Sequence, residues 1–255
     1  MTVEAHRARL APYIEPHLAR REAGIKHPVH DFLFTYYSFR PAQLLRWTAG
    51  ASVLPEDRRV LVSTLLRLLR ATAGRAGNFS CFGLHEWAMV HRADETRHPQ
   101  PLRLGGAATD AVVESHRIAC SHFDAYRFFT PAAVPLNTLR PRHDDRADFE
   151  QPACLHGNMD LYGKVAVRLS PLIPSELIAD AFELAWDIRI MDMRAAPYDL
   201  TGITLDPTGE PWAPIKIETP AGKREYADLQ RQFAERAAPI RQRLVDECER
   251  LLGSG

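Results

Sequence analysis

The sequence predicts a mainly α-helical fold with minor β-structure, arranged as a single compact domain over residues 1–255. Two long segments, 175–193 and 223–252, carry apolar side chains at helical spacing. Proline, glycine and threonine gather between them, in 197–222, where strand signals are short. No repeat, low-complexity tract or linker divides the chain, and 255 residues are enough to bury a substantial core.

The first part of the chain predicts two helices and a short aromatic element. Residues 3–23 carry leucine and isoleucine at helical spacing, and two prolines inside this range should bend the helix. Residues 32–39 are rich in aromatic side chains and precede Pro41, which predicts a short buried element. Acidic residues after Pro55 favour a helix start, so a helix is expected over 58–72.

The second part predicts a loop, two helices and a strand. Two prolines and polar residues indicate a loop over 94–106, and 211–218 is typical of a turn and strand. Residues 175–193 have an amphipathic pattern behind a serine that can cap the helix. Pro239 should kink the helix over 223–252. One face of the 175–193 helix carries regularly spaced carboxylates, which indicates a solvated face and not a di-iron site: Glu176, Asp180, Glu183 and Asp187.

The charge balance argues against nucleic acid as a partner. Thirty-two basic residues balance 32 acidic ones, whereas a duplex-DNA binder usually has a basic surplus. The sequence has four widely spaced cysteines and no signal-peptide pattern, which predicts a cytoplasmic protein with free thiols. It has no window of ~18 apolar residues, which predicts no membrane contact. The motifs of phosphate-binding loops, dinucleotide folds, serine-hydrolase elbows and HExxH zinc enzymes are absent from the sequence.

Three of the four cysteines lie just ahead of a histidine, in segments that also carry carboxylates. The segments are Cys81 to Glu86, Cys120 to Asp124 and Cys154 to Asp160. Donors of several kinds in three separate segments are what a fold needs to build one metal site. None of the three is a recognised metal signature, so the expectation rests on their combination.

His122 and Asp124 have the spacing of the H-x-D part of a two-histidine, one-carboxylate iron site. On an extended segment both side chains point the same way, and His156 is the best placed histidine to complete the set. Three protein ligands leave positions open on Fe(II) for molecular oxygen and substrate. If residues 110–129 are helical instead, His122 and Asp124 point to different faces.

Other polar residues complete the candidate site. His85 is a substitute metal ligand and Glu86 a candidate acid–base group, although His85 can equally be a buried histidine bonded to the backbone. If 155–168 is helical, Asp160 shares a face with His156 and can ligate the metal or orient the imidazole. Arg194, near the end of a predicted helix, can compensate the helix dipole or bind substrate. The role of Asp192 is equally open. Three residues are candidates for orienting the substrate: Asn158, Arg194 and Tyr198.

Six segments together resemble an actinobacterial family labelled "3-methyladenine DNA glycosylase". They are spread over most of the chain, at 26–38, 83–90, 114–117, 121–125, 158–162 and 192–195. With its metal-capable segments, the chain resembles a nonheme iron oxygenase of nucleoside-antibiotic biosynthesis, of the oxazinomycin type. The resemblance implies Fe(II), molecular oxygen as co-substrate, and a small nucleoside-like heterocycle, a pyridine C-nucleoside, as substrate.

A DNA glycosylase that excises alkylated bases is the alternative, with Asp124 or Glu86 activating water. Glycosylases of the helix-hairpin-helix type carry a Gly-x-Gly hairpin, whereas residues 104–111 offer Gly-Gly followed by alanines. The sequence therefore favours the oxygenase, with a noncatalytic heterocycle-binding protein as a third hypothesis. In the oxygenase, the predicted metal ligands are His122, Asp124 and His156.

Overall fold

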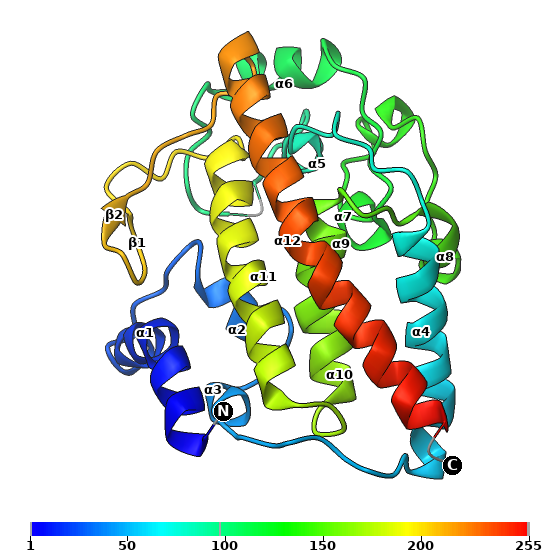
Figure 1. Ribbon diagram of the computed structural model, residues 1–255. Coiled ribbons are helices and arrows are strands. Elements are labelled where there is room, and N and C mark those ends of the chain that lie inside the picture. Colours follow the sequence, from blue (N-terminus) through cyan, green and yellow to red (C-terminus); the bar gives the residue numbers. More distant parts are fainter. Residues whose placement is uncertain (1, 97, 254–255) are drawn as a thin grey trace.

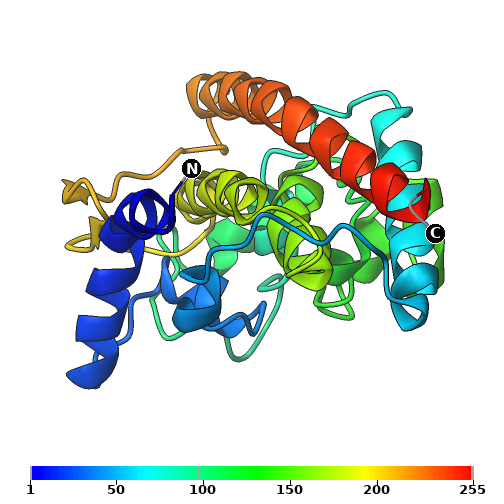
Figure 2. The ribbon, with the colours of Figure 1, turned by 60° about the horizontal axis from the view of Figure 1, so that its bottom comes forward.

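Helix α11 (Ser175–Ala195) lies at the centre of the structure, a computed structural model that describes residues 2–96 and 98–253. It packs against α1 (Val3–Glu22), α9 (Leu155–Asp160) and α12 (Pro220–Gly253), as Figure 1 shows. In Figure 2, α12 covers one side of α11, and the segment with α2 and α3 lies on the opposite side.

The other elements are short, apart from α4, which packs along α12. They are α2 (Asp31–Thr35), α3 (Pro41–Leu44), the 3-10 helix η1 (Glu56–Arg58), α4 (Arg59–Ala73), α5 (Leu84–Ala88), α6 (Gly106–Glu114), α7 (Phe123–Tyr126), the 3-10 helices η2 (Val134–Leu136) and η3 (His143–Asp145), α8 (Arg146–Phe149), the π-helix η4 (Leu161–Ala166), α10 (Val167–Leu169), β1 (Thr204–Leu205) and β2 (Glu210–Pro211).

The predicted fold class is confirmed: the domain is mainly helical, and its described residues form one two-stranded antiparallel sheet. The four predicted long helices correspond to α1, α4, α11 and α12, and both α1 and α12 continue through their prolines. The strand expected over 211–218 is wrong beyond Pro211. That segment runs along the end of α11 instead, where Ile215 N donates to the Arg194 carbonyl and Trp212 Nε1 to the Met193 carbonyl.

The carboxylates of α11 form ion pairs with the neighbouring helices. Arg9 of α1 lies 2.7 Å from both Asp180 and Glu183, and Arg236 of α12 lies 2.7 Å from Asp187. The opposite face is buried and mostly apolar. The acidic stripe is therefore the polar face of α11, but it is not simply solvated, since three of its carboxylates are half-buried in ion pairs with α1 and α12.

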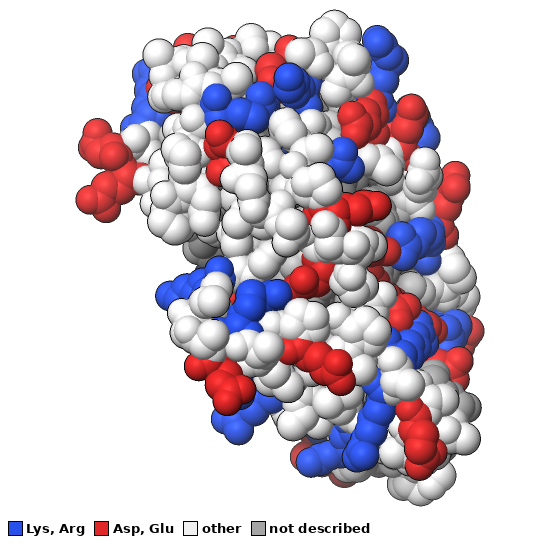
Figure 3. Space-filling model, turned by 90° about the vertical axis from the view of Figure 1, so that its left-hand side faces the viewer, with Lys and Arg blue, Asp and Glu red and all other residues white. Residues whose placement is uncertain are grey.

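The outer surface mixes charges of both signs. On the face that carries α1 and the β1–β2 hairpin, Lys and Arg are interspersed with Asp and Glu (Figure 3). Among the described residues, no helix is long and apolar enough to cross a membrane.

The π-helix η4 allows a close approach between two segments. A Cβ atom at Gly163 would lie 1.9 Å from the Tyr37 ring, so only glycine fits there. Tyr37 uses this space to reach α9, where its hydroxyl donates to Asp160 at 3.2 Å. The glycine in η4 thus lets the 36–39 segment lie beside the candidate site.

Replacing Gly163 with alanine should lower the free energy of unfolding by about 2 kcal/mol, because the new methyl group displaces the Tyr37 ring in a packed interior. Urea denaturation measures this change. Gly106→Ala is the control, since no atom lies within 4 Å of its added Cβ; it should change stability by less than about 1 kcal/mol. Equal effects of the two substitutions would contradict the close approach.

His30 is a buried histidine that is held neutral. Its ring stacks on Trp186 at 4.2 Å, and its Nε2 accepts the Asp206 backbone N–H at 2.9 Å. Burial and the neighbouring His27 lower the pKa of His30 to about 2. Below the ordinary histidine pKa of about 6.5, the unfolded chain therefore binds a proton that the folded chain does not.

The free energy of unfolding should consequently fall by about 1.4 kcal/mol per pH unit for this histidine between about pH 6 and pH 4. His30→Gln removes the titrating group and should make the measured slope shallower by that amount. His143→Gln, at a side chain that is 79% exposed, should leave the slope unchanged. An unchanged slope in His30→Gln would show that His30 is protonated in the folded protein.

Candidate metal centre

The candidate site begins at helix α5, which starts after a left-handed turn. Gly83 has φ of 70°, which favours glycine, and a Cβ there would lie 3.3 Å from the Tyr226 ring. The turn points two consecutive polar side chains inward, because His85 is 3% exposed and Glu86 6% exposed. Both therefore reach the interior from one short helix.

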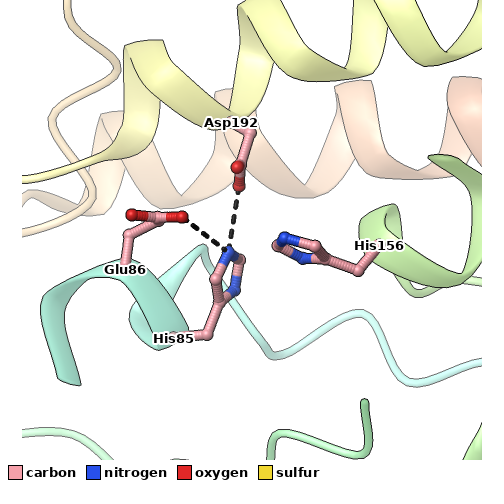
Figure 4. Close-up of side chains that lie close together, drawn as sticks. All are labelled: His85, Glu86, His156 and Asp192. Atoms are coloured by element: carbon pink, nitrogen blue, oxygen red, sulfur yellow. Dashed lines mark hydrogen bonds and ion pairs between the residues drawn. The ribbon is translucent and has the colours of Figure 1, made fainter. Parts of the chain in front are cut away.

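Four side chains from three helices converge there (Figure 4). His85 and Glu86 come from α5, His156 from α9 and Asp192 from α11. Each offers one ligand atom within 4.8 Å of the other three. His85 Nε2 donates to Asp192 Oδ1 at 3.1 Å and lies 3.9 Å from Glu86 Oε1. Two imidazoles and two carboxylates form a donor set that suits a divalent transition metal.

The two histidines of this group differ in protonation. Burial alone would lower the pKa of His85, but the charge and hydrogen bond of Asp192 raise that pKa well above its ordinary value. Burial, reinforced by the charge of His85, lowers the pKa of His156 to about 3. Within the described part of the chain, the His156 ring contacts His85 and His122 but makes no hydrogen bond. A neutral imidazole without a hydrogen bond is a ready metal ligand, and a cation would take the place of the His85 proton.

A second group, formed by His122, Glu150 and Asp160, lies beside the first. Arg146 contacts Glu150 at 2.5 Å and Asp160 at 2.8 Å, and His122 Nε2 donates to Asp160 at 3.0 Å. Burial would lower the pKa of His122, but the bond to Asp160 raises it. This group therefore has its own cations and no neutral histidine, so we assign the metal to the first group.

A third group, formed by His27, His30 and Asp206, already uses three of its four ring nitrogens in hydrogen bonds to the backbone. His27 Nε2 donates to the Thr204 carbonyl, and its Nδ1 accepts backbone N–H groups. His30 Nε2 also accepts a backbone N–H. These bonds indicate a structural role.

Two small cavities flank the first group. One, of about 40 Å³, is lined by Glu86 and His156 from the group and by His122, Asp124 and Asp160. Its outer wall consists of aromatic side chains: Phe32, Tyr36, Tyr37 and Phe128. The other, of about 10 Å³, is lined by His85, His122, His156 and the three cysteines that precede them in the sequence: Cys81, Cys120 and Cys154. The three Cys–His segments thus meet around one place.

The predicted triad of His122, Asp124 and His156 lines one cavity, the larger of the two, but its donor atoms do not form one of the metal-capable groups. His85, Glu86 and His156 belong to the first group, and His122 belongs to the second. Asp124 lines the larger cavity, where it forms ion pairs with Lys164 at 3.2 Å and Arg127 at 3.2 Å. His122 is the extended residue before α7 and Asp124 lies in its first turn, and both side chains line this cavity.

The predicted substrate-orienting residues have partners in the scaffold. Asn158 is fully buried and bonds to Arg241 and to the Pro152 carbonyl. Arg194 donates to the Ala213 carbonyl and pairs with Glu225. Tyr198 is fully buried in a separate apolar cluster, with its ring 4.9 Å from His98. These contacts favour structural roles for all three.

Asp192 is the site residue whose role the sequence leaves open. It lies seven residues after Ala185 and four after Ile188, both on the apolar face of α11, and not in line with the acidic stripe. A carboxylate on the apolar face of a buried helix is the signal that identifies it. Comparisons with protein-family models, curated proteins and solved structures found no match, so the assignment rests on this geometry.

Replacing His156 with alanine should reduce the affinity for Fe(II) or a surrogate such as Co(II) more than 100-fold, because one of four ligands is lost. Anaerobic titration with elemental analysis measures this. The matched control is His122→Gln, which should bind the metal within a few-fold of the original affinity. Loss of metal in His122→Gln with retention in His156→Ala would move the site to the second group.

Proposed function

We propose that this chain is a mononuclear nonheme Fe(II)-dependent oxygenase that oxidises or rearranges the heterocycle of a small nucleoside-like substrate, a pyridine C-nucleoside of antibiotic biosynthesis. The observation that carries the proposal is the buried group of His85, Glu86, His156 and Asp192. Bound iron supplies the binding and activation of molecular oxygen beside the substrate. These four side chains would hold the ion.

The scaffold residues hold this group in place. Asp192 lies on the central helix, and Arg189, one turn earlier, approaches its second oxygen at 3.4 Å. Arg189 itself stacks over Phe32 at 4.2 Å and donates to the Val29 carbonyl. Such outer contacts orient a ligating carboxylate. The Gly83 turn orients the α5 pair from the other side.

The larger cavity supports an aromatic substrate. Phe32 and Tyr36 stack at 4.7 Å in its half-buried outer wall, and a flat heterocycle gains most from such rings. The cavity of about 40 Å³ fits oxygen or a water, whereas ligand pockets commonly reach about 300 Å³ or more. Substrate entry therefore requires the aromatic wall to move outward.

Polar groups in this cavity can act on the bound ring. Asp124, paired with Lys164, and Glu86 both line it, so they are placed to accept or hold a proton there. We place the reaction in the cytoplasm, since four free cysteines suit a reducing compartment.

Oxygen consumption by the Fe(II)-loaded protein should depend on a pyridine C-nucleoside. The variant Tyr36→Ala should raise the KM for this nucleoside about tenfold and leave the iron content unchanged. Loss of one stacking partner costs ~1–3 kcal/mol. Tyr126→Ala, at another half-buried tyrosine, is the control. No substrate-dependent oxygen consumption would contradict the oxygenase, and metal-independent release of an alkylated base from DNA would support the glycosylase instead.

A further inference from the structure

A large cavity is lined by residues of α3, of the chain that leads from α3 to α4, and of α10. Figure 1 shows this part of the chain passing below α10. Its volume is about 560 Å³, which is within the usual range for small-molecule pockets. It shares no lining residue with the two cavities that flank the candidate metal centre. The lining consists of Ser38, Phe39, Gln43, Arg46, Thr48, Arg58, Leu61, Val167, Arg168, Ser170 and Pro171.

All the charged residues in this lining are arginines: Arg46, Arg58 and Arg168. Among residues 2–96 and 98–253, none of the three forms an ion pair. Other arginines of the chain do pair with carboxylates, such as Arg9 with Asp180 of α11 and Arg103 with Glu218 at 2.8 Å. Three guanidinium groups without carboxylates form a region of positive potential in a protein whose formal net charge is zero.

Arg58 is held in place by one hydrogen bond and has a donor that remains unused. One of its terminal nitrogens donates to the Arg168 carbonyl, which fixes the side chain at the cavity wall. Its Nε is buried and has no hydrogen-bond partner among the described residues. A buried charged donor without an acceptor is costly, so an external acceptor would be stabilising there.

The opposite wall carries an unusual backbone conformation. Ser38 has φ of 54°, in the left-handed region that a residue with a side chain rarely adopts. Its exposed hydroxyl, with Gln43 and Thr48, adds polar groups to the lining. Strained residues of this kind gather at ligand sites.

We propose that this cavity binds a small phosphate-bearing molecule of about nucleotide size. Planar guanidinium groups bind phosphate oxygens through paired, charge-assisted hydrogen bonds. The volume accommodates a phosphate group together with an organic part against Phe39 and Leu61. The site is separate from the metal centre, so the proposal does not depend on the oxygenase.

The competing ligand is a nucleic acid. Arg168 also lines a neighbouring cavity with Arg67 and Arg146, which extends the basic region along α4. That second cavity is also lined by the carboxylate of Asp144. A concave pocket whose only charged lining residues are arginines favours the small anion.

Calorimetric titration with inorganic pyrophosphate and with uridine 5′-monophosphate tests the proposal at fixed, low salt. The intact chain should bind at least one of them, and Arg168→Gln and Arg46→Gln should each weaken binding about tenfold or more. Neither side chain has an ion-pair or hydrogen-bond partner among the described residues, so these variants should fold normally. The control, Arg224→Gln, removes the same charge from an exposed arginine outside the pocket and should change affinity less than twofold.

Three results would overturn the site. They are no binding of either probe at millimolar concentration, equal weakening in Arg224→Gln, and binding of a single-stranded oligonucleotide that pyrophosphate does not displace. Pyrophosphate binding without nucleotide binding would restrict the ligand to an inorganic or diphosphate group and retain the site.

Discussion

The hydrogen bond between His85 and Asp192 connects the central helix to the short helix that begins at Gly83. Asp192 is fully buried on α11, and a carboxylate in that position is stable only with a cation or several donors beside it. His85, Arg189 and the arrangement of α5 all serve this one charge. Removing either partner of this bond would leave a buried charge uncompensated, so the two helices depend on each other for this contact.

Two neighbouring groups of similar composition meet this requirement in different ways. Around Asp160, Arg146 and His122 supply the positive charge, and Tyr37 occupies the remaining oxygen. Around Asp192 the protein supplies less positive charge, because Arg189 lies farther from the carboxylate, at 3.4 Å, and His156 is neutral. One cluster is thus complete without an ion, and the other has room for one. His156 lies between them, within ring contact of both.

The sequence was sufficient to predict the long helices and the segments that meet at the site. Periodicity predicted α1, α4, α11 and α12, because each buries apolar side chains at helical spacing. The cysteine–histidine segments predicted the meeting of 81–86, 120–124 and 154–160, because several donor types recur there. The pairing within the site could not be predicted. Whether Asp124 or Asp160 faces His122 depends on where the short helix α7 begins, which tertiary contacts decide.

The π-helix η4 has a geometric consequence for the two ends of the 155–169 helix. A π turn contains one residue more than an α turn, so everything after it is rotated by about 100° relative to an uninterrupted helix. His156 and Asp160 precede this turn and face the metal-capable groups, whereas Arg168 follows it and faces the basic cavity. The extra residue therefore sets the angular phase between two separate ligand surfaces on one helix. Deleting a single residue from 161–166 would leave each surface chemically intact but rotate one of them out of register with its cavity.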